Sequence, residues 1–258
     1  MLPFLLIQTR SDDSAAADEL RSTTELGGFA EGQLAALRLD QEMAACVSAP
    51  GTHQRPDYDW AQLLAEHSGV ILCGSPFNSS DPDELKSDLQ LAVEAELRRM
   101  LDVVVAQDVP FMGACYGVGT LGLHQGAVVD GTYGEPAGVV SVAVTEEGAA
   151  DPLLDGVDPV FEAYVGHKEA VRELPEHAVV LVRGEGCPVQ MFRIGQNLYA
   201  TQFHPELDRE GLLHRLKVYA DRGYFDPAEA DELFASIRAS EVTQPQRVLA
   251  NFVRRYAR

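Results

Sequence analysis

The sequence has 258 residues, 46% of them hydrophobic and 23% charged, so the chain is long enough to bury a substantial core. Its 40 acidic residues outnumber 20 basic residues, and the formal charge of -20 creates an average field that repels phosphate backbones and anionic membrane surfaces. This balance argues against nucleic acid and membranes as partners.

The chain starts with MLPFLLIQT, a short apolar run that no basic residue precedes and that acidic residues follow at once. This pattern is typical neither of a signal peptide nor of a membrane span, and it predicts a first buried strand. The cysteines at 46, 73, 115 and 187 form no C-x-x-C pair and no zinc-type spacing. We therefore expect a reduced, cytoplasmic protein that needs neither a metal nor an organic cofactor.

Strand and helix patterns alternate through the first half of the chain. Gly27-Gly28 stops the first helical pattern, and Asp81 followed by Pro82 is typical of the N-cap and first position of another helix. The predicted elements are a strand at 2–9, a helix at 11–27, a strand at 69–74, a helix at 81–103 and a strand at 103–114.

The second half of the chain changes character twice. Residues 126–203 are rich in β-branched residues and turns, and the Gly195-Gln196-Asn197 step predicts a hairpin. After residue 207 the pattern is helical to the end, with helices opening at Asp226-Pro227 and at Thr243. We therefore expect a three-layer α/β sandwich with a mainly parallel central sheet over residues 1–210, and a helical extension over 211–258 that packs on it.

The stretch GACYGVGTLG, residues 113–122, fits two different motifs. Read from Gly117 it is G-x-G-x-x-G, a dinucleotide fingerprint for which Asp130 could hold a ribose, but its first glycine would then lie inside a helix instead of at the strand end. Read from Gly113 it is a G-x-C-x-G elbow that presents Cys115 as a nucleophile on a strand-to-helix turn. The helix N-terminus would stabilise a thiolate and offer the N–H of Tyr116 to an oxyanion, so we favour the elbow.

A second polar group lies in QFHPEL, residues 202–207. His204 and Glu206 are two residues apart, so in extended backbone they point the same way, and the carboxylate can orient the imidazole. Together with the upstream elbow they predict a Cys115, His204, Glu206 triad. The order nucleophile, histidine, acid differs from the order in α/β-hydrolases.

These two motifs together resemble the class I glutamine amidotransferase family, whose Cys-His-Glu triad hydrolyses the side-chain amide of glutamine. The resemblance covers roughly residues 1–210 and implies a flavodoxin-like fold. The segment GVILCGSPFNSSD resembles the family's glycine-rich oxyanion loop, which implies a second oxyanion donor near Gly74 and Ser75.

The resemblance also implies a substrate pocket around the elbow. Its expected lining comprises Gly113, Gly117, Val118, Gly119 and His167, although His167 could equally be an ordinary polar residue in a turn. Many members have His-Gln or Met-Gln directly after the elbow, and there the Gln helps to hold the substrate, whereas this chain has Val118 and Gly119. That departure puts a preference for free glutamine in question.

The resemblance leaves three functions open. Ammonia from glutamine could pass to a synthetase partner, since this chain has no P-loop for nucleotide chemistry. The protein could instead be a free-standing hydrolase of γ-glutamyl amides or peptides, or a catalytically silent binding subunit on the same fold. The amphipathic C-terminal helices either pack on the flank of the domain or form a docking surface for a synthetase or for a second copy.

Overall fold

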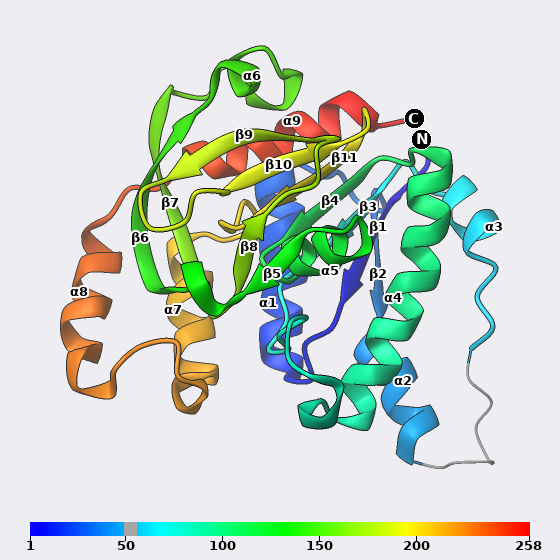
Figure 1. The fold of residues 1–258 in the computed structure, drawn as a ribbon, viewed down its shortest axis with the longest axis horizontal. Helices are drawn as coiled ribbons and strands as arrows, with labels where there is room; N and C mark the ends of the chain where they lie inside the picture. Colours follow the sequence, from blue (N-terminus) through cyan, green and yellow to red (C-terminus); the bar gives the residue numbers. More distant parts are fainter. Residues whose placement is uncertain (49–55) are drawn as a thin grey trace.

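A computed structural model describes residues 1–48 and 56–258 (Figure 1). In this part of the chain a nine-stranded sheet has the order β2-β1-β3-β4-β11-β10-β9-β6-β7, and β5 pairs with β8 in a small second sheet. The strands are β1 (Phe4–Gln8), β2 (Leu34–Arg38), β3 (Val70–Leu72), β4 (Phe111–Ala114), β5 (Val128–Asp130), β6 (Glu135–Val144), β7 (Val160–His167), β8 (Ala170–Glu173), β9 (Ala178–Gly184), β10 (Met191–Ile194) and β11 (Leu198–Thr201).

The large sheet is parallel in one part and antiparallel in the other. Strands β2, β1, β3, β4 and β11 run parallel, and the pairs from β11 onward to β7 are antiparallel. The hairpin expected at residues 195–197 joins β10 to β11. The predicted α/β sandwich with a mainly parallel core is therefore confirmed.

Helices cover both faces of this sheet (Figure 1). The helices are α1 (Asp13–Gly27), α2 (Leu39–Ser48), α3 (Trp60–Ala65), α4 (Asp88–Gln107), α5 (Tyr116–His124), α6 (Glu146–Ala149), α7 (Arg209–Val218), α8 (Ala230–Ala239) and α9 (Gln244–Tyr256). Among the described residues no helix is both long and apolar enough to cross a membrane.

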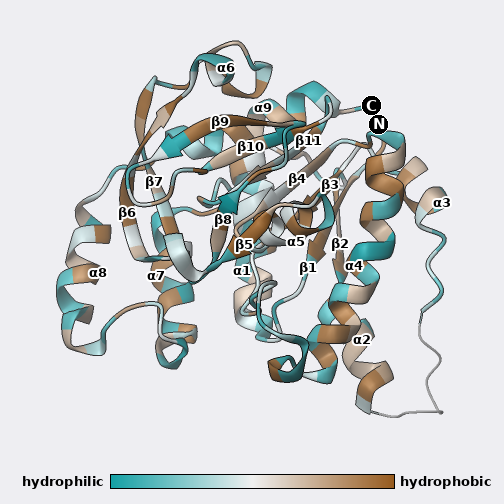
Figure 2. Ribbon diagram, in the orientation of Figure 1, coloured by the Kyte–Doolittle hydropathy of each residue, from teal (hydrophilic) through white to brown (hydrophobic). Residues whose placement is uncertain are grey.

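Alternate side chains of β1 pack into two different hydrophobic clusters, one on each face of the sheet. Leu5 and Ile7 belong to a core cluster shared with α4 and α5, whereas Phe4 and Leu6 belong to a cluster that includes Phe252 of α9. Successive side chains of a strand point to opposite faces, so a strand that is apolar throughout needs helices on both sides. In Figure 2 hydrophobic colours prevail on the central strands, whereas α4 carries both hydrophobic and hydrophilic colours.

Two sequence predictions in the first half were wrong in detail. The long helix begins at Asp88 and not at Asp81, because Ser87 accepts a hydrogen bond from the N–H of Gln90 and acts as the N-cap, while residues 83–85 form a separate short turn of helix. The apolar run from residue 103 belongs to the end of this helix, and β4 starts only at Phe111. The elements β2, α2 and α3 were not predicted.

The helices after residue 207 pack on the sandwich at two places. Helix α9, which begins after Thr243 as expected, buries Val248, Leu249 and Phe252 in the core beside α1. Helices α7 and α8 join β6 and β7 through a third apolar cluster that includes Leu212, Leu216, Ile237 and Tyr164. Helix α7 thereby lies close to the carboxyl ends of the parallel strands.

Candidate active site

The elbow after β4 places Cys115 in an uncommon backbone conformation. Its φ is 52° and its ψ is -89°, and it immediately precedes α5. A Cβ on Gly113 would lie 2.8 Å from the Cα of Gly117, so the tight turn requires glycine at 113. Gly117 lies inside α5 and not at the strand end, which agrees with the elbow and disagrees with a dinucleotide fingerprint.

The neighbouring strand brings the histidine to this elbow. Strand β11 pairs in parallel with β4, and the N–H of Cys115 donates to the carbonyl oxygen of Thr201 at 2.7 Å. His204 follows three residues later, and its own N–H donates to the carbonyl oxygen of Tyr164. The carboxyl ends of adjacent parallel strands meet at one edge of the sheet, so Cys115 and His204 border one cavity although they are far apart in sequence.

His204 and Glu206 contact each other as predicted, but through a different backbone. The Nδ1 of His204 donates to Oε1 of Glu206 at 2.7 Å, and both side chains are buried. Residues 205 and 206 lie in a turn closed by Leu207 N–H and the His204 carbonyl oxygen, not in extended backbone. The hydrogen bond fixes the ring so that Nε2 stays available for proton transfer.

Two arginines and a second glutamate complete a buried charge network. The Nη1 of Arg215 lies 3.3 Å from Glu206 Oε1, and its Nη2 lies 3.5 Å from Glu19 Oε2. Arg10 donates from Nε to the same Glu19 oxygen at 2.7 Å. Two guanidinium groups therefore balance two carboxylates, which a buried cluster of this kind requires.

These surroundings set the protonation of the triad. Burial lowers the pKa of His204 while the Glu206 charge opposes that shift, so the imidazole is neutral at rest. Burial would raise the pKa of Glu206, but its contacts with His204 and Arg215 prevail and lower it, so the carboxylate stays ionised.

The resting state of the nucleophile differs from the sequence prediction of a thiolate. Burial raises the pKa of Cys115 to about 12, although the positive charges of Arg10 and Arg215 act in the opposite direction. These shifts favour a thiol at Cys115 beside a neutral imidazole.

The loop after β3 lies against both Cys115 and His204. A Cβ on Gly74 would be 3.0 Å from Cε1 of His204 and 3.6 Å from Cβ of Cys115. Ser75 lines the cavity with Cys115, and Tyr116 begins α5, so its N–H is one of those that have no acceptor within the helix. The structure thus brings all three expected oxyanion residues to the elbow.

Two narrow cavities meet at Cys115. One, of about 30 Å³, lies toward α7 and is bordered by Arg215, Tyr219 and Tyr224. The other, of about 10 Å³, is bordered by Tyr116, His167, Glu169 and Gln202 among others. Each has room for about one water-sized molecule in the ligand-free protein.

Not all of the residues expected to bind substrate lie at these cavities. His167 lines the second cavity, where its Nε2 lies 2.9 Å from Glu135 Oε2. Val118 is buried in the core shared with α4 and borders neither cavity. Gly113 and Gly117 serve the close packing of the elbow, and Gly119 faces Glu169 and Ser79. Of these five residues, His167 therefore lines the second cavity, and Gly119 packs against Glu169 of its wall.

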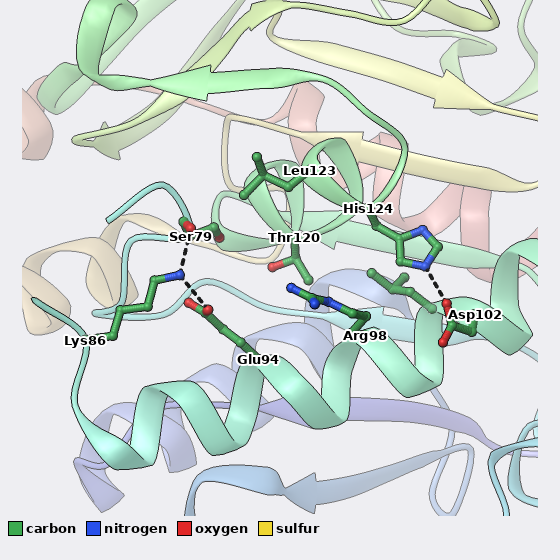
Figure 3. Close-up of a pocket in the computed structure, with 9 residues that line it drawn as sticks. Ser79, Lys86, Glu94, Arg98, Asp102, Thr120, Leu123 and His124 are labelled. Carbon is green, nitrogen blue, oxygen red and sulfur yellow. Dashed lines mark hydrogen bonds and ion pairs between the residues drawn. The ribbon is translucent and has the colours of Figure 1, made fainter. Parts of the chain in front are cut away.

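A larger cavity of about 420 Å³ lies between α4 and α5 (Figure 3). Lys86, Glu94 and Arg98 line it together with Ser79 of the loop after β3. Cys115, His204 and Glu206 do not border it, so this cavity is not the reaction site.

Two groups of described residues have the ligand types that metals use: Glu135, His167 and Cys187, and Glu19, Cys73 and Glu206. In the first, Glu135 Oε2 is bonded to His167 and also accepts from Gln190 Nε2 at 2.7 Å. In the second, arginines occupy the carboxylates. Protein N–H groups already bind Glu135 Oε2, both oxygens of Glu19 and Glu206 Oε1, whereas Glu206 Oε2 has no hydrogen-bond partner among the described residues. Neither group therefore presents a complete set of unengaged metal ligands.

Sequence reasoning missed several residues of the site. Arg10, Glu19 and Arg215 belong to helices or strand ends with no motif around them, and no local pattern marks them. Gln202 lies in the QFHPEL stretch two residues before His204, and Glu169 lies two residues after His167. Their position beside motif residues was the one available signal.

The curated proteins that this chain resembles include GMP synthases. It is 28% identical over 148 residues to the GMP synthase [glutamine-hydrolyzing] of Hamiltonella defensa subsp. Acyrthosiphon pisum (strain 5AT), a match over 54% of this chain and 25% of that protein. The GMP synthase [glutamine-hydrolyzing] of Salmonella typhimurium (strain LT2) is 28% identical over 153 residues, or 56% of this chain and 27% of that protein. The match thus spans about a quarter of the length of these relatives.

Solved structures agree on the fold. A glutamine amidotransferase from Thermotoga maritima superposes with a TM-score of 0.70 at 18% identity, over 99% of this chain and 97% of that one. One from Methylobacillus flagellatus gives 0.67 at 19% identity, over 100% and 96%. The family model "Glutamine amidotransferase class-I" matches residues 45–211, which include the elbow and the His-Pro-Glu turn. The predicted resemblance is confirmed, and the chain belongs to the class I glutamine amidotransferase family.

Proposed function

We propose that this protein hydrolyses a γ-glutamyl amide, glutamine foremost, through a thioester on Cys115. The observation that carries the proposal is the buried hydrogen bond from His204 to Glu206, placed beside the cysteine elbow by adjacent strands. A neutral imidazole held by an ionised carboxylate is the arrangement that accepts a proton from a weakly acidic nucleophile.

The reaction then proceeds in two halves. As the sulfur of Cys115 bonds to the amide carbon, its proton passes to Nε2 of His204, and backbone N–H groups of Tyr116 and of the loop at Gly74 and Ser75 face the new oxyanion. The C–N bond breaks when His204 returns the proton to the leaving nitrogen, which releases ammonia. Water, deprotonated by His204, attacks the thioester, glutamate leaves, and Cys115 regains the proton.

The relatives named GMP synthase support delivery of the ammonia to an acceptor that another protein or subunit provides. A free-standing hydrolase of γ-glutamyl peptides is the second candidate. A silent binding subunit would have no use for the complete charge network around Glu206.

The test is glutamate release by the purified protein from glutamine and from a panel of γ-glutamyl amides and peptides, with Cys115→Ala alongside. Turnover of glutamine that depends on Cys115 would support the proposal. Turnover confined to peptides would favour the second candidate. Release that is undiminished in Cys115→Ala would overturn the role of the cysteine.

A further inference from the structure

Tyr224 lies between α7 and α8, beyond the segment that the family model matches, and borders both narrow cavities at Cys115. It also borders a third, outer cavity of about 610 Å³, whose wall includes Lys168, Phe225 and Asp226. Among the described residues that line these three cavities, only Tyr224 borders all of them. Its side chain therefore lies between Cys115 and a space that is large enough for a substrate.

The side chain of Tyr224 reaches from the outer cavity to the elbow. On the outer side, the Nζ of the exposed Lys168 lies 5.2 Å from the centre of the tyrosine ring. On the inner side, burial raises the pKa of Tyr224 to about 12, and the negative charge of Cys115 is the next largest cause. The hydroxyl group is therefore directed toward the sulfur.

The space beside Cys115 is too small for substrate in the ligand-free protein. The two narrow cavities, of about 30 Å³ and 10 Å³, each have room for about one water-sized molecule, and glutamine is several times larger. Substrate therefore reaches the sulfur only after a residue of the cavity wall moves.

His167 is fixed in the wall that the smaller inner cavity shares with the outer cavity. Its Nε2 lies 2.9 Å from Oε2 of Glu135, and its Nδ1 lies 2.9 Å from the carbonyl oxygen of Glu169. Both ring nitrogens are thus engaged. The other residues of this shared wall are Lys168, which is exposed, and Tyr224.

The ring of Tyr224 is held less firmly than its backbone. The carbonyl oxygen of Tyr224 accepts from the N–H of Ala137 at 2.8 Å, whereas the hydroxyl forms no hydrogen bond with a residue that the structure describes. The contact with Lys168 is a cation–π interaction, which is weak at an exposed site. We propose that Tyr224 controls access to Cys115: directed inward its ring closes the elbow, and turned into the outer cavity it admits the γ-glutamyl substrate.

The identity of the substrate rests on the proposed function, but thiol labelling tests access to Cys115 without turnover. Mass spectrometry follows the rate at which N-ethylmaleimide modifies Cys115 in the wild-type protein and in Tyr224→Ala. We expect the rate to rise roughly 10- to 1000-fold, because a minor open conformation is typically populated at roughly 0.1–10%. An unchanged rate in a folded Tyr224→Ala protein would overturn the inference.

Other residues of the chain provide the controls. Cys73 and Cys187 are buried, so they report general unfolding, and their labelling should stay slow in Tyr224→Ala. Tyr133→Ala removes a half-buried tyrosine that borders none of the three cavities, and it should leave the rate at Cys115 unchanged. Tyr224→Phe keeps the ring and should also label slowly. If Tyr224→Ala unfolds, Tyr224→Leu, which retains apolar contact with the third cluster, provides the same test.

Turnover provides a second measurement, with γ-glutamyl-p-nitroanilide and glutamine as the two substrates. The larger leaving group needs a wider entrance, so the kcat/KM ratio of the anilide to glutamine should rise in Tyr224→Ala and not in Tyr224→Phe. An equal ratio in Tyr224→Ala and the wild type would contradict a role in admitting substrate. Faster labelling of Cys115 without turnover of either compound would count against the proposed function alone.

Discussion

Arg215 of α7 and Glu206 of the His-Pro-Glu turn lie 3.3 Å apart, Nη1 to Oε1, and the same Nη1 is 3.3 Å from Nδ1 of His204. Arg215 lies outside the segment that the family model matches, residues 45–211. The acid of the proposed triad is therefore supported by a residue beyond the matched region, on a helix that begins at its end. Its charge lowers the pKa of His204, as does that of Arg10.

Replacing Arg215 by Met should move the acid limb of the kcat/KM profile to higher pH. The positive charge of Arg215 lowers the pKa of His204, so removal of that charge raises the pKa. The imidazole is then neutral only at higher pH, and it can accept a proton only when it is neutral. Loss of a buried partner should also reduce the free energy of unfolding by about 3 kcal/mol. Arg215→Lys, which keeps the charge, is the control and should show a smaller shift; an identical shift in both variants would contradict the electrostatic explanation.

Replacing Glu206 by Gln should move the same limb in the opposite direction. Glu206 raises the pKa of His204, so its removal lowers that pKa and extends the active range to more acidic pH. The plateau should nevertheless fall by roughly 10²- to 10⁴-fold, because the imidazole loses the group that orients it. Steady-state rates between pH 4 and pH 8 check both effects. An acid limb that moves upward would show that Glu206 acts in another way.

The sequence predicted the elements that carry a strong local signal. The elbow follows from two glycines around one cysteine, and the hairpin at residues 195–197 follows from turn residues between β-branched runs. The start of α4 could not be located, because Asp81-Pro82 and Ser87 both resemble helix starts and only the packed structure selects Ser87. The charge network around Glu206 could not be predicted either, since Arg215 reaches both Glu206 and Glu19 only after α1 and α7 pack together.

The pair Gly119 and Glu169 should behave as one unit in a double-mutant cycle. Gly119→Gln alone should destabilise the protein by about 1–3 kcal/mol, because the new side chain has to displace Glu169 from its backbone contacts. With Glu169→Ala in the same chain, most of that loss should disappear, since the space is vacated. Urea unfolding of the four proteins measures the coupling. Additive effects of the two substitutions would show that the side chains do not compete for this space.

The backbone conformation at Cys115 lowers the stability of the protein. A side chain at φ 52° and ψ -89° costs about 1–3 kcal/mol relative to a relaxed residue, and glycine avoids this strain. Of two variants without the thiol, Cys115→Gly should therefore have a free energy of unfolding about 1 kcal/mol higher than that of Cys115→Ala, after the greater chain entropy of glycine is included. Urea unfolding measures this difference. Folding stability alone would favour a glycine at the elbow, so the cysteine there is the residue that the proposed chemistry, and not stability, requires.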